Sequence, residues 1–386
     1  MALLEQNGKH QRSQRQEQPR FLAPAASEGG PRLSGLLALT FRRLWRHLLL
    51  SEYFVLYITL AYFLVLWPII PDIASLDNLS NILSNTGPLL CIAIGQTFVL
   101  LVAGIDLSQG AIVGLASVIG AMLMTTSLDP NLFSKSPFWG SLLGPHGSPL
   151  AGSPLSVPLG IAAMLLSGAL VGLLNGVAVT RFRMPPFMVT LVTMIFFDAL
   201  AIWLTKSETI IFLPRSFTVL GDGALGFVPY VVLIALGLAL AAHLLLSQTI
   251  FGRHLYAIGT NLRTAIVSGV PTRRAVTLAY VISGFCAGLS SVLYTARLQT
   301  GNPTLGDNIL LDVIGATVIG GTSLFGGKGK IVWTIFGVLF FVLLDNSLNL
   351  LSLSFYTVTA VKGAFIVLAA LLNVTRVRFL ERSTGK

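Results

Sequence analysis

One carboxylate, Asp106, lies between two long apolar runs that carry no charged side chain, residues 88–103 and 111–124. The connection that holds it reads Gly104-Ile105-Asp106-Leu107-Ser108-Gln109-Gly110. A charge at the centre of a membrane-spanning helix costs about 2.5–3.5 kcal/mol on an insertion scale. Asp106 therefore either reaches the surface at a turn or is paired inside a helical bundle.

Other ionisable side chains also lie in or near apolar runs, namely Asp198, Asp312, Asp345 and Lys362. Buried carboxylates form proton or cation relays in ion-coupled carriers, so these acids support an ion-coupled secondary transporter as an alternative function. Their sequence context does not reveal partners. The simplest interpretation of Lys362 is a side chain that snorkels to the outer interface.

Signatures of enzymatic and metal chemistry are missing from the sequence. It contains no HExxH or GxSxG motif, and its five histidines do not cluster. The glycine-rich stretch before Lys328 fails the phosphate-loop pattern, because Gly329 follows the lysine and Thr322 stands where the first glycine belongs. Cys91 and Cys286 lie in apolar runs, and we expect them to pack in the core without a disulfide or a metal. We expect no catalytic residue, cofactor site or metal site on this chain.

The composition is that of an integral membrane protein. Of 386 residues, 54% are apolar and 10% are charged, and the mean hydropathy is +0.81. Soluble domains carry about 25% charged residues. A formal charge of +10 is compatible with nucleic-acid binding, but the basic residues fall mainly in the N-terminal tail and in short connections between apolar runs. We therefore expect no nucleic-acid partner and an all-α, polytopic helical bundle.

Ten apolar runs are long enough to be read as transmembrane spans. They are residues 50–70, 85–103, 110–127, 155–179, 186–205, 228–246, 275–296, 308–325, 331–350 and 356–374. With the N-terminus inside, 20 Lys and Arg fall in inner segments and 4 in outer segments. This asymmetry favours ten spans with both termini cytoplasmic.

The same topology places Asp106 at a cytoplasmic turn, provided that the preceding run crosses completely. Residues 76–87 resemble a separate short helix that lies outside the membrane or dips into it. A broken or re-entrant helix there would instead put Asp106 in the protein interior.

Domain organisation follows from these runs. We expect a polar cytoplasmic tail with a basic surface segment resting on lipid over 1–47, one transmembrane domain over 48–375, and a cytoplasmic tail over 376–386. The longest outer loop, 128–154, has aromatic side chains at its tip that suit an interface belt or, alternatively, a docking surface.

Small residues recur at four-residue spacing in three apolar runs, which predicts close helix packing. They are Gly168, Gly172 and Gly176, then Gly110 with Gly114, and Gly284 with Gly288.

The longest inner connection, 248–274, contains a predicted short helix. Asn261 can cap it, Gly269 can end it after Ser268, and Pro271 follows. Periodicity alone leaves two functions equally open, contact with a cytoplasmic partner or an amphipathic turn on the membrane surface.

Three blocks together resemble the permease subunits of ATP-binding-cassette importers for ribose, xylose, arabinose, galactose and related solutes. The first block is Ala103-Gly104-Ile105-Asp106-Leu107-Ser108. The second is Phe251-Gly252-Arg253 with Tyr256-Ala257-Ile258-Gly259, Asn261 and Ser268-Gly269. The third is Gly320-Gly321-Thr322-Ser323-Leu324-Phe325-Gly326-Gly327-Lys328-Gly329. The resemblance covers most of residues 50–375, and the order and spacing of the blocks make it specific.

The resemblance implies a multi-pass protein of the bacterial inner membrane that works with partners. These are a second permease copy or a paralogue, a cytoplasmic ATPase that carries ATP and Mg²⁺, and a periplasmic solute-binding protein. It makes residues 248–274 the coupling segment, with ATPase contacts at Gly259, Asn261, Arg263, Ala265, Ser268 and Gly269. The motif residues Gly104, Asp106, Ser108, Gly320, Gly321, Ser323, Gly326 and Gly327 become fixed features of the fold. For Asp106 and Ser108 we expect helix capping at the start of the third span.

Two departures from the family pattern concern the partner and the solute. Leu262-Arg263-Thr264 stands where acidic residues are common, and Asp198-Ala199 stands where Arg-Gly is common. The solute is therefore open between a sugar and a non-sugar such as a nucleoside. A structural membrane protein without transport remains a third class.

Overall fold

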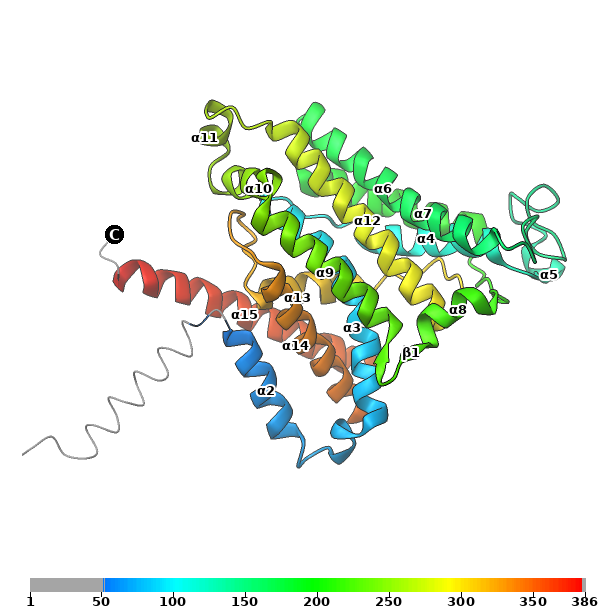
Figure 1. Cartoon of the computed structure of the whole chain (residues 1–386), viewed down its shortest axis with the longest axis horizontal. Helices are drawn as coiled ribbons and strands as arrows, with labels where there is room; N and C mark the ends of the chain where they lie inside the picture. Colours follow the sequence, from blue (N-terminus) through cyan, green and yellow to red (C-terminus); the bar gives the residue numbers. More distant parts are fainter. Residues whose placement is uncertain (1–50, 52, 384–386) are drawn as a thin grey trace, which may run out of the picture. The chain divides into compact units, whose positions relative to one another are not determined.

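Helices dominate the chain because a backbone inside a bilayer must satisfy its hydrogen bonds within its own segment. The structure is a computed structural model that describes residues 51 and 53–383, and these belong to a compact unit over residues 50–386. In chain order the helices are α2 (Phe54–Leu66), α3 (Leu76–Leu101), α4 (Gln109–Met124), α5 (Pro130–Phe133), α6 (Ser156–Arg181), α7 (Pro186–Thr205), α8 (Arg215–Asp222), α9 (Tyr230–Gln248), α10 (Ile250–Thr260), α11 (Leu262–Val267), α12 (Thr272–Leu298), α13 (Ile309–Gly320), α14 (Ile331–Leu350) and α15 (Phe355–Ser383) (Figure 1).

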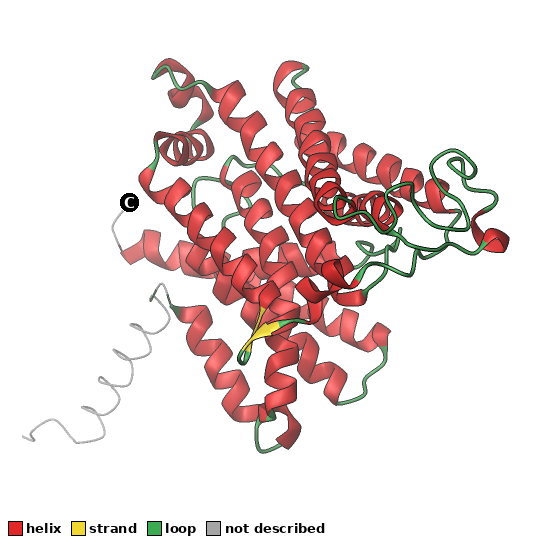
Figure 2. Ribbon diagram, turned by 45° about the vertical axis from the view of Figure 1, so that its right-hand side comes forward, coloured by secondary structure: helices red, strands yellow, loops and turns green. Residues whose placement is uncertain are grey.

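Strand structure within the described residues is confined to a two-stranded antiparallel ribbon, β1 (Ala224–Leu225) and β2 (Val228–Pro229) (Figure 2). The prediction of an all-α chain is therefore confirmed for this part of the molecule. The predictions for the tail over 1–47 lie outside the described residues.

Every apolar run predicted as a span contains a helix. In the described part of the chain, six helices are long and apolar enough to cross a membrane, namely α3, α6, α7, α9, α12 and α14. α2, α4, α13 and the portion Phe355–Leu368 of α15 are shorter apolar helices. The number of ten crossings and the cytoplasmic position of both termini remain predictions.

The prediction of a separate short helix at 76–87 is wrong, because α3 runs without a break through these residues and past Pro88. Ser75 caps its start by accepting a hydrogen bond from the Asn78 backbone N–H, at 3.2 Å. The buried Asn78 amide exchanges hydrogen bonds with the amide of Asn346 on α14, at 3.0 and 2.8 Å. Asn78, one of the polar residues that suggested a surface helix, thus has its partner inside the bundle, whereas Asp77 is exposed.

α6 packs closely on α12, which confirms the prediction of close helix packing made from the small residues of these two helices. A Cβ atom at Gly168 would collide with the carbonyl oxygen of Gly284, and one at Gly284 would collide with that of Gly168. Gly172 meets the backbone of Tyr280 in the same way. Cys91 and Cys286 are both buried, as expected for core packing.

The glycines of α4 have a different partner, because Gly110 and Gly114 face a non-helical segment rather than a helix. A Cβ at Gly110 would lie 2.7 Å from the carbonyl oxygen of Gly306, and one at Gly114 would collide with that of Pro303. The connection between α12 and α13 therefore lies directly against α4. Ser117 of α4 accepts the Asn302 N–H at 3.1 Å and holds this connection in place.

Candidate functional site

Asp106 lies in the non-helical connection between α3 and α4 and is fully buried. Its Oδ1 accepts hydrogen bonds from the backbone N–H and the hydroxyl of Ser108, at 3.0 and 2.6 Å. Its Oδ2 accepts one from the hydroxyl of Ser283 on α12, at 2.7 Å. Of the two possibilities left open by the sequence, pairing inside the bundle is the one the structure adopts.

Of the capping roles expected for Asp106 and Ser108, that of Ser108 is wrong, whereas Asp106 accepts one backbone N–H at the start of α4. Ser108 occupies the N-cap position of α4, but its side chain makes no capping hydrogen bond. The one backbone N–H that Asp106 accepts belongs to Ser108 itself, outside the first turn of the helix. The carboxylate also joins the α3–α4 connection to α12, because both serine hydroxyls point their protons at it.

A wider polar network surrounds this carboxylate. Asn175 on α6 donates to the Ser108 hydroxyl at 2.8 Å, and Gln109 donates to the Ser283 hydroxyl at 2.8 Å. Four segments of the bundle are thereby connected through one buried acid: the α3–α4 connection, α4, α6 and α12. Neither Asn175 nor Ser283 was singled out from the sequence, since a lone Asn or Ser in an apolar helix carries no spacing signal.

Gly104 lies beside this network. A Cβ there would lie 2.6 Å from the hydroxyl oxygen of Tyr280, which is buried on α12. The residue before it, Ala103, has a φ of +60°, and the connection turns sharply here. Only a residue without a side chain leaves room for the tyrosine.

The three motif blocks singled out in the sequence meet at one place in the structure. Ala103, two residues after the end of α3, comes from the first block and lies against Gly326 of the third, and Gly259 of α10 comes from the second. The Gly327 N–H donates to the Leu101 carbonyl at 3.0 Å. A Cβ at Gly259 would collide with that same carbonyl oxygen and with the Gly327 nitrogen. We call this contact the motif junction.

The turn that supplies Gly327 depends on glycines with left-handed backbone angles. Gly321 ends α13 with a φ of +111°, and Gly326 and Gly327 have φ values of +86° and +70°. Ser323 closes the turn, because its N–H donates to the Lys328 carbonyl at 2.9 Å. Gly320 packs on the backbone of Trp333 in α14. The backbone angles of Gly321, Gly326 and Gly327 lie in the region that favours glycine over other residues.

A side-chain hydrogen bond ties α10 to the same turn. The Tyr256 hydroxyl donates to the Gly329 carbonyl at 2.7 Å, and burial raises the pKa of this tyrosine above its usual range. The hydroxyl is therefore a permanent donor at physiological pH.

The predicted helix after Asn261 is present as α11. The Asn261 side chain accepts the Thr264 N–H at 3.0 Å, and Gly269 follows the helix with a φ of +78°. Ala265 is buried and anchors α11, whereas Arg263 and Ser268 are exposed. Three apolar side chains also point outward, with exposed fractions of 51% at Leu262, 55% at Ile266 and 88% at Val267. Figure 1 shows α11 and α10 together at one end of the bundle, beside the start of α12.

The interpretation of Lys362 as a snorkelling side chain is wrong. Its ammonium group lies 3.0 Å from Asp312 of α13 and 2.6 Å from Asp345 of α14. One buried lysine on α15 thus pairs with two of the three acids that had suggested an ion relay. The third, Asp198 on α7, makes no hydrogen bond or ion pair with a described residue.

Comparisons with known proteins agree with these observations. Residues 78–370 match the family described as branched-chain amino acid transport system / permease component. The ribose import permease protein of Haemophilus influenzae is 33% identical over 307 residues, which are 78% of this chain and 87% of that protein. The D-allose transport system permease protein of Escherichia coli is 31% identical over 323 residues, 84% of this chain and 90% of that protein. The galactose/methyl galactoside import permease protein of H. influenzae is 30% identical over 310 residues, 78% and 88% of the two chains. No solved structure matches the chain.

Proposed function

Since the chain belongs to the family of branched-chain amino acid transport system permease components, we propose that it forms the translocation pathway of an ATP-binding-cassette importer for a monosaccharide. The sugar assignment comes from the relatives, whose names specify ribose, D-allose and galactose. Hydrolysis of ATP with Mg²⁺ takes place on a separate ATPase, and a periplasmic binding protein delivers the solute. The chain is a multi-pass protein of the bacterial inner membrane, with ten crossings and both termini cytoplasmic.

One observation carries this proposal, namely the exposed surface of α11 combined with its rigid connection to the motif junction. Exposed Leu262, Ile266 and Val267 form an apolar surface next to Arg263 on a short helix. Apolar side chains with a charged neighbour on an exposed helix are typical of a protein-docking surface. α11 is therefore the coupling helix, and the ATPase is its partner.

The contacts inside the bundle supply a path from the ATPase to the spans. α11 continues from α10 through Asn261, and α10 contacts the end of α3 at Gly259. Leu101, which receives the Gly327 hydrogen bond, precedes the connection that holds Asp106. A shift of α11 on ATP binding therefore moves α3 and the polar network together as rigid bodies.

The assembly contains two copies of the permease, or this chain with a paralogue, and their spans form the solute path between them. Asp198 supports a role in that path, because a half-buried carboxylate without a protein partner requires water or a polar ligand rather than lipid. A nucleoside remains the second candidate solute, because it presents ribose hydroxyls of the same kind. Co-purification of the binding protein, followed by a binding screen against monosaccharides and nucleosides, identifies the solute.

Charge reversal on the coupling helix is expected to disconnect hydrolysis from transport. Arg263→Glu should weaken ATPase docking about tenfold or more, as expected for the loss of a central interface contact. The measurement is stimulation of ATPase activity by solute-loaded binding protein in liposomes. Co-purification of the ATPase is measured beside it, and for that measurement Lys135→Glu is the matched control, since Lys135 is exposed in the predicted outer loop. Full stimulation in Arg263→Glu would refute the docking role of α11.

A backbone change after α11 is expected to have the same effect. Gly269 has a φ of +78° and donates its N–H to the Ile266 carbonyl at 3.0 Å, and proline permits neither. Gly269→Pro should therefore lose ATPase stimulation while the purified chain stays folded. Gly226→Pro is the matched control substitution, because Gly226 also has a positive φ, +64°, and lies in the β1–β2 turn on the opposite side of the predicted membrane. Equal loss of stimulation in both variants would show a general folding defect instead.

A further inference from the structure

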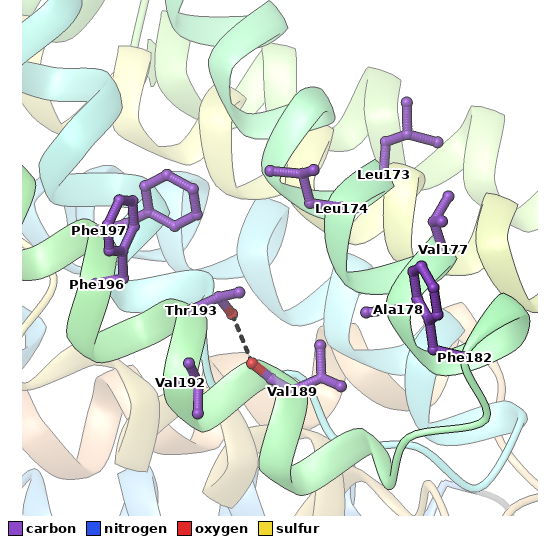
Figure 3. Close-up of a pocket in the computed structure, with 10 residues that line it drawn as sticks. All are labelled: Leu173, Leu174, Val177, Ala178, Phe182, Val189, Val192, Thr193, Phe196 and Phe197. Atoms are coloured by element: carbon purple, nitrogen blue, oxygen red, sulfur yellow. Dashed lines mark hydrogen bonds between the residues drawn. The ribbon is translucent and has the colours of Figure 1, made fainter.

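An open apolar groove of about 610 Å³ separates α6 from α7 (Figure 3). Apolar side chains of both helices line it, among them Val177 and Ala178 of α6, Val189 and Phe196 of α7, and Phe182 after the end of α6, together with Thr193. The single hydroxyl among them, on Thr193, is already donated to the Val189 carbonyl, at 3.0 Å. No side chain that lines the groove offers a free hydrogen-bond donor, so the groove favours a hydrocarbon chain over a polar solute.

Two arginines are the sequence neighbours of a residue that lines the groove. Phe182, which lines it and is 70% exposed, stands between Arg181 and Arg183, both of which are exposed. Two more exposed arginines, Arg273 and Arg274, begin α12. They are close to the end of α6, because Thr180 and Thr277 hydrogen-bond at 2.9 Å.

Three of the connections predicted on the same side carry no acid to balance this charge. These connections, residues 181–185, 249–274 and 321–330, contain no Asp or Glu. Arg181 and Arg183 form no ion pair with a described residue. Basic pockets between membrane helices on the cytoplasmic side are typical sites for anionic lipid head groups.

We propose that this groove is a binding site for one anionic phospholipid, with an acyl chain between α6 and α7 and the phosphate at Arg181 and Arg183. The lipid goes beyond the proposed transport function, although its leaflet follows from the proposed topology. A second permease copy is disfavoured in this groove. In a two-fold interface the same surface faces itself, so four of these arginines would be brought together.

Native mass spectrometry of the purified full chain tests the site without solute or ATPase, so the result is independent of transport. The probes are dioleoyl phosphatidylglycerol and dioleoyl phosphatidylcholine, which share acyl chains and differ in head-group charge. The wild-type chain is expected to retain one phosphatidylglycerol about thirtyfold more strongly than phosphatidylcholine, as two arginines near a lipid phosphate predict.

Variants of the chain distinguish the contribution of the head group to lipid binding from that of the acyl chain. Arg181→Gln with Arg183→Gln should abolish the preference, and Lys135→Gln with Lys206→Gln, in the predicted outer segments, should keep it. Ala178→Trp fills the groove and should lower retention of both lipids. An unchanged preference in the double arginine variant would overturn the proposal. So would a disulfide-linked dimer formed by Val177→Cys in membranes, because it would place a second copy in the groove.

Discussion

Asp106→Leu is expected to destabilise the transmembrane domain strongly, whereas Asp106→Asn is expected to keep most of its stability. Leucine removes the acceptor of three hydrogen bonds, from the Ser108 N–H, the Ser108 hydroxyl and the Ser283 hydroxyl. Each buried donor left without a partner costs about 1–3 kcal/mol, so the total loss is about 3 kcal/mol or more. Asparagine retains one acceptor oxygen, and a rotated serine hydroxyl can accept from its amide. Thermal unfolding of the purified chain measures both effects.

Asp77 provides the control for this pair of variants. It is exposed in the first turn of α3, so Asp77→Leu and Asp77→Asn should both unfold near the wild-type temperature. If Asp106→Asn lost as much stability and transport as Asp106→Leu, the negative charge itself would be required. The interpretation that Asp106 acts as a hydrogen-bond acceptor whose negative charge is not needed would then be wrong.

Gly259→Val is expected to separate the three motif blocks and to lose the ATPase from the purified complex. The new side chain would meet backbone atoms of Leu101 and Gly327, which cannot rotate away. Overpacking of this kind costs about 3 kcal/mol or more when no flexible group can yield. Even Gly259→Ala should lower the unfolding temperature, because the first added carbon is the one that collides.

Gly237 in α9 is the matched control for Gly259. It is also a helical glycine, but a Cβ there meets nothing within 4 Å. Gly237→Val should therefore keep the unfolding temperature and the co-purified ATPase. Wild-type behaviour of Gly259→Ala would contradict the motif junction.

The helices were accessible to sequence analysis because their signals are local. Apolar runs predicted the helices α2, α3, α4, α6, α7, α9, α12, α13, α14 and α15. The glycine spacing in α6 and α12 predicted close packing, though not which helix each one contacts, since a small residue at every fourth position forms a smooth strip on one helix face. The capping amide of Asn261 and the terminating Gly269 predicted α11 nearly to the residue. Each of these signals lies within a few residues of the structure that it specifies.

The contacts between distant helices were not accessible in the same way. Asn175 and Ser283 reach Asp106 only because α6, α12 and the α3–α4 connection pack together, and uniformly apolar helices do not reveal which face turns inward. The ion pairs of Lys362 with Asp312 and Asp345 could not be predicted for the same reason, since they join different helices. The role of residues 248–274 required the family resemblance, because periodicity left docking and membrane contact equally open.

Uptake by reconstituted proteoliposomes tests the central claim most directly. The chain is reconstituted with and without its ATPase and binding protein, and accumulation of labelled monosaccharide is followed under internal ATP or under a proton gradient. We expect uptake only in the complete system with ATP, and none from the chain alone. Accumulation by the chain alone under a proton gradient would contradict the account and establish an ion-coupled carrier.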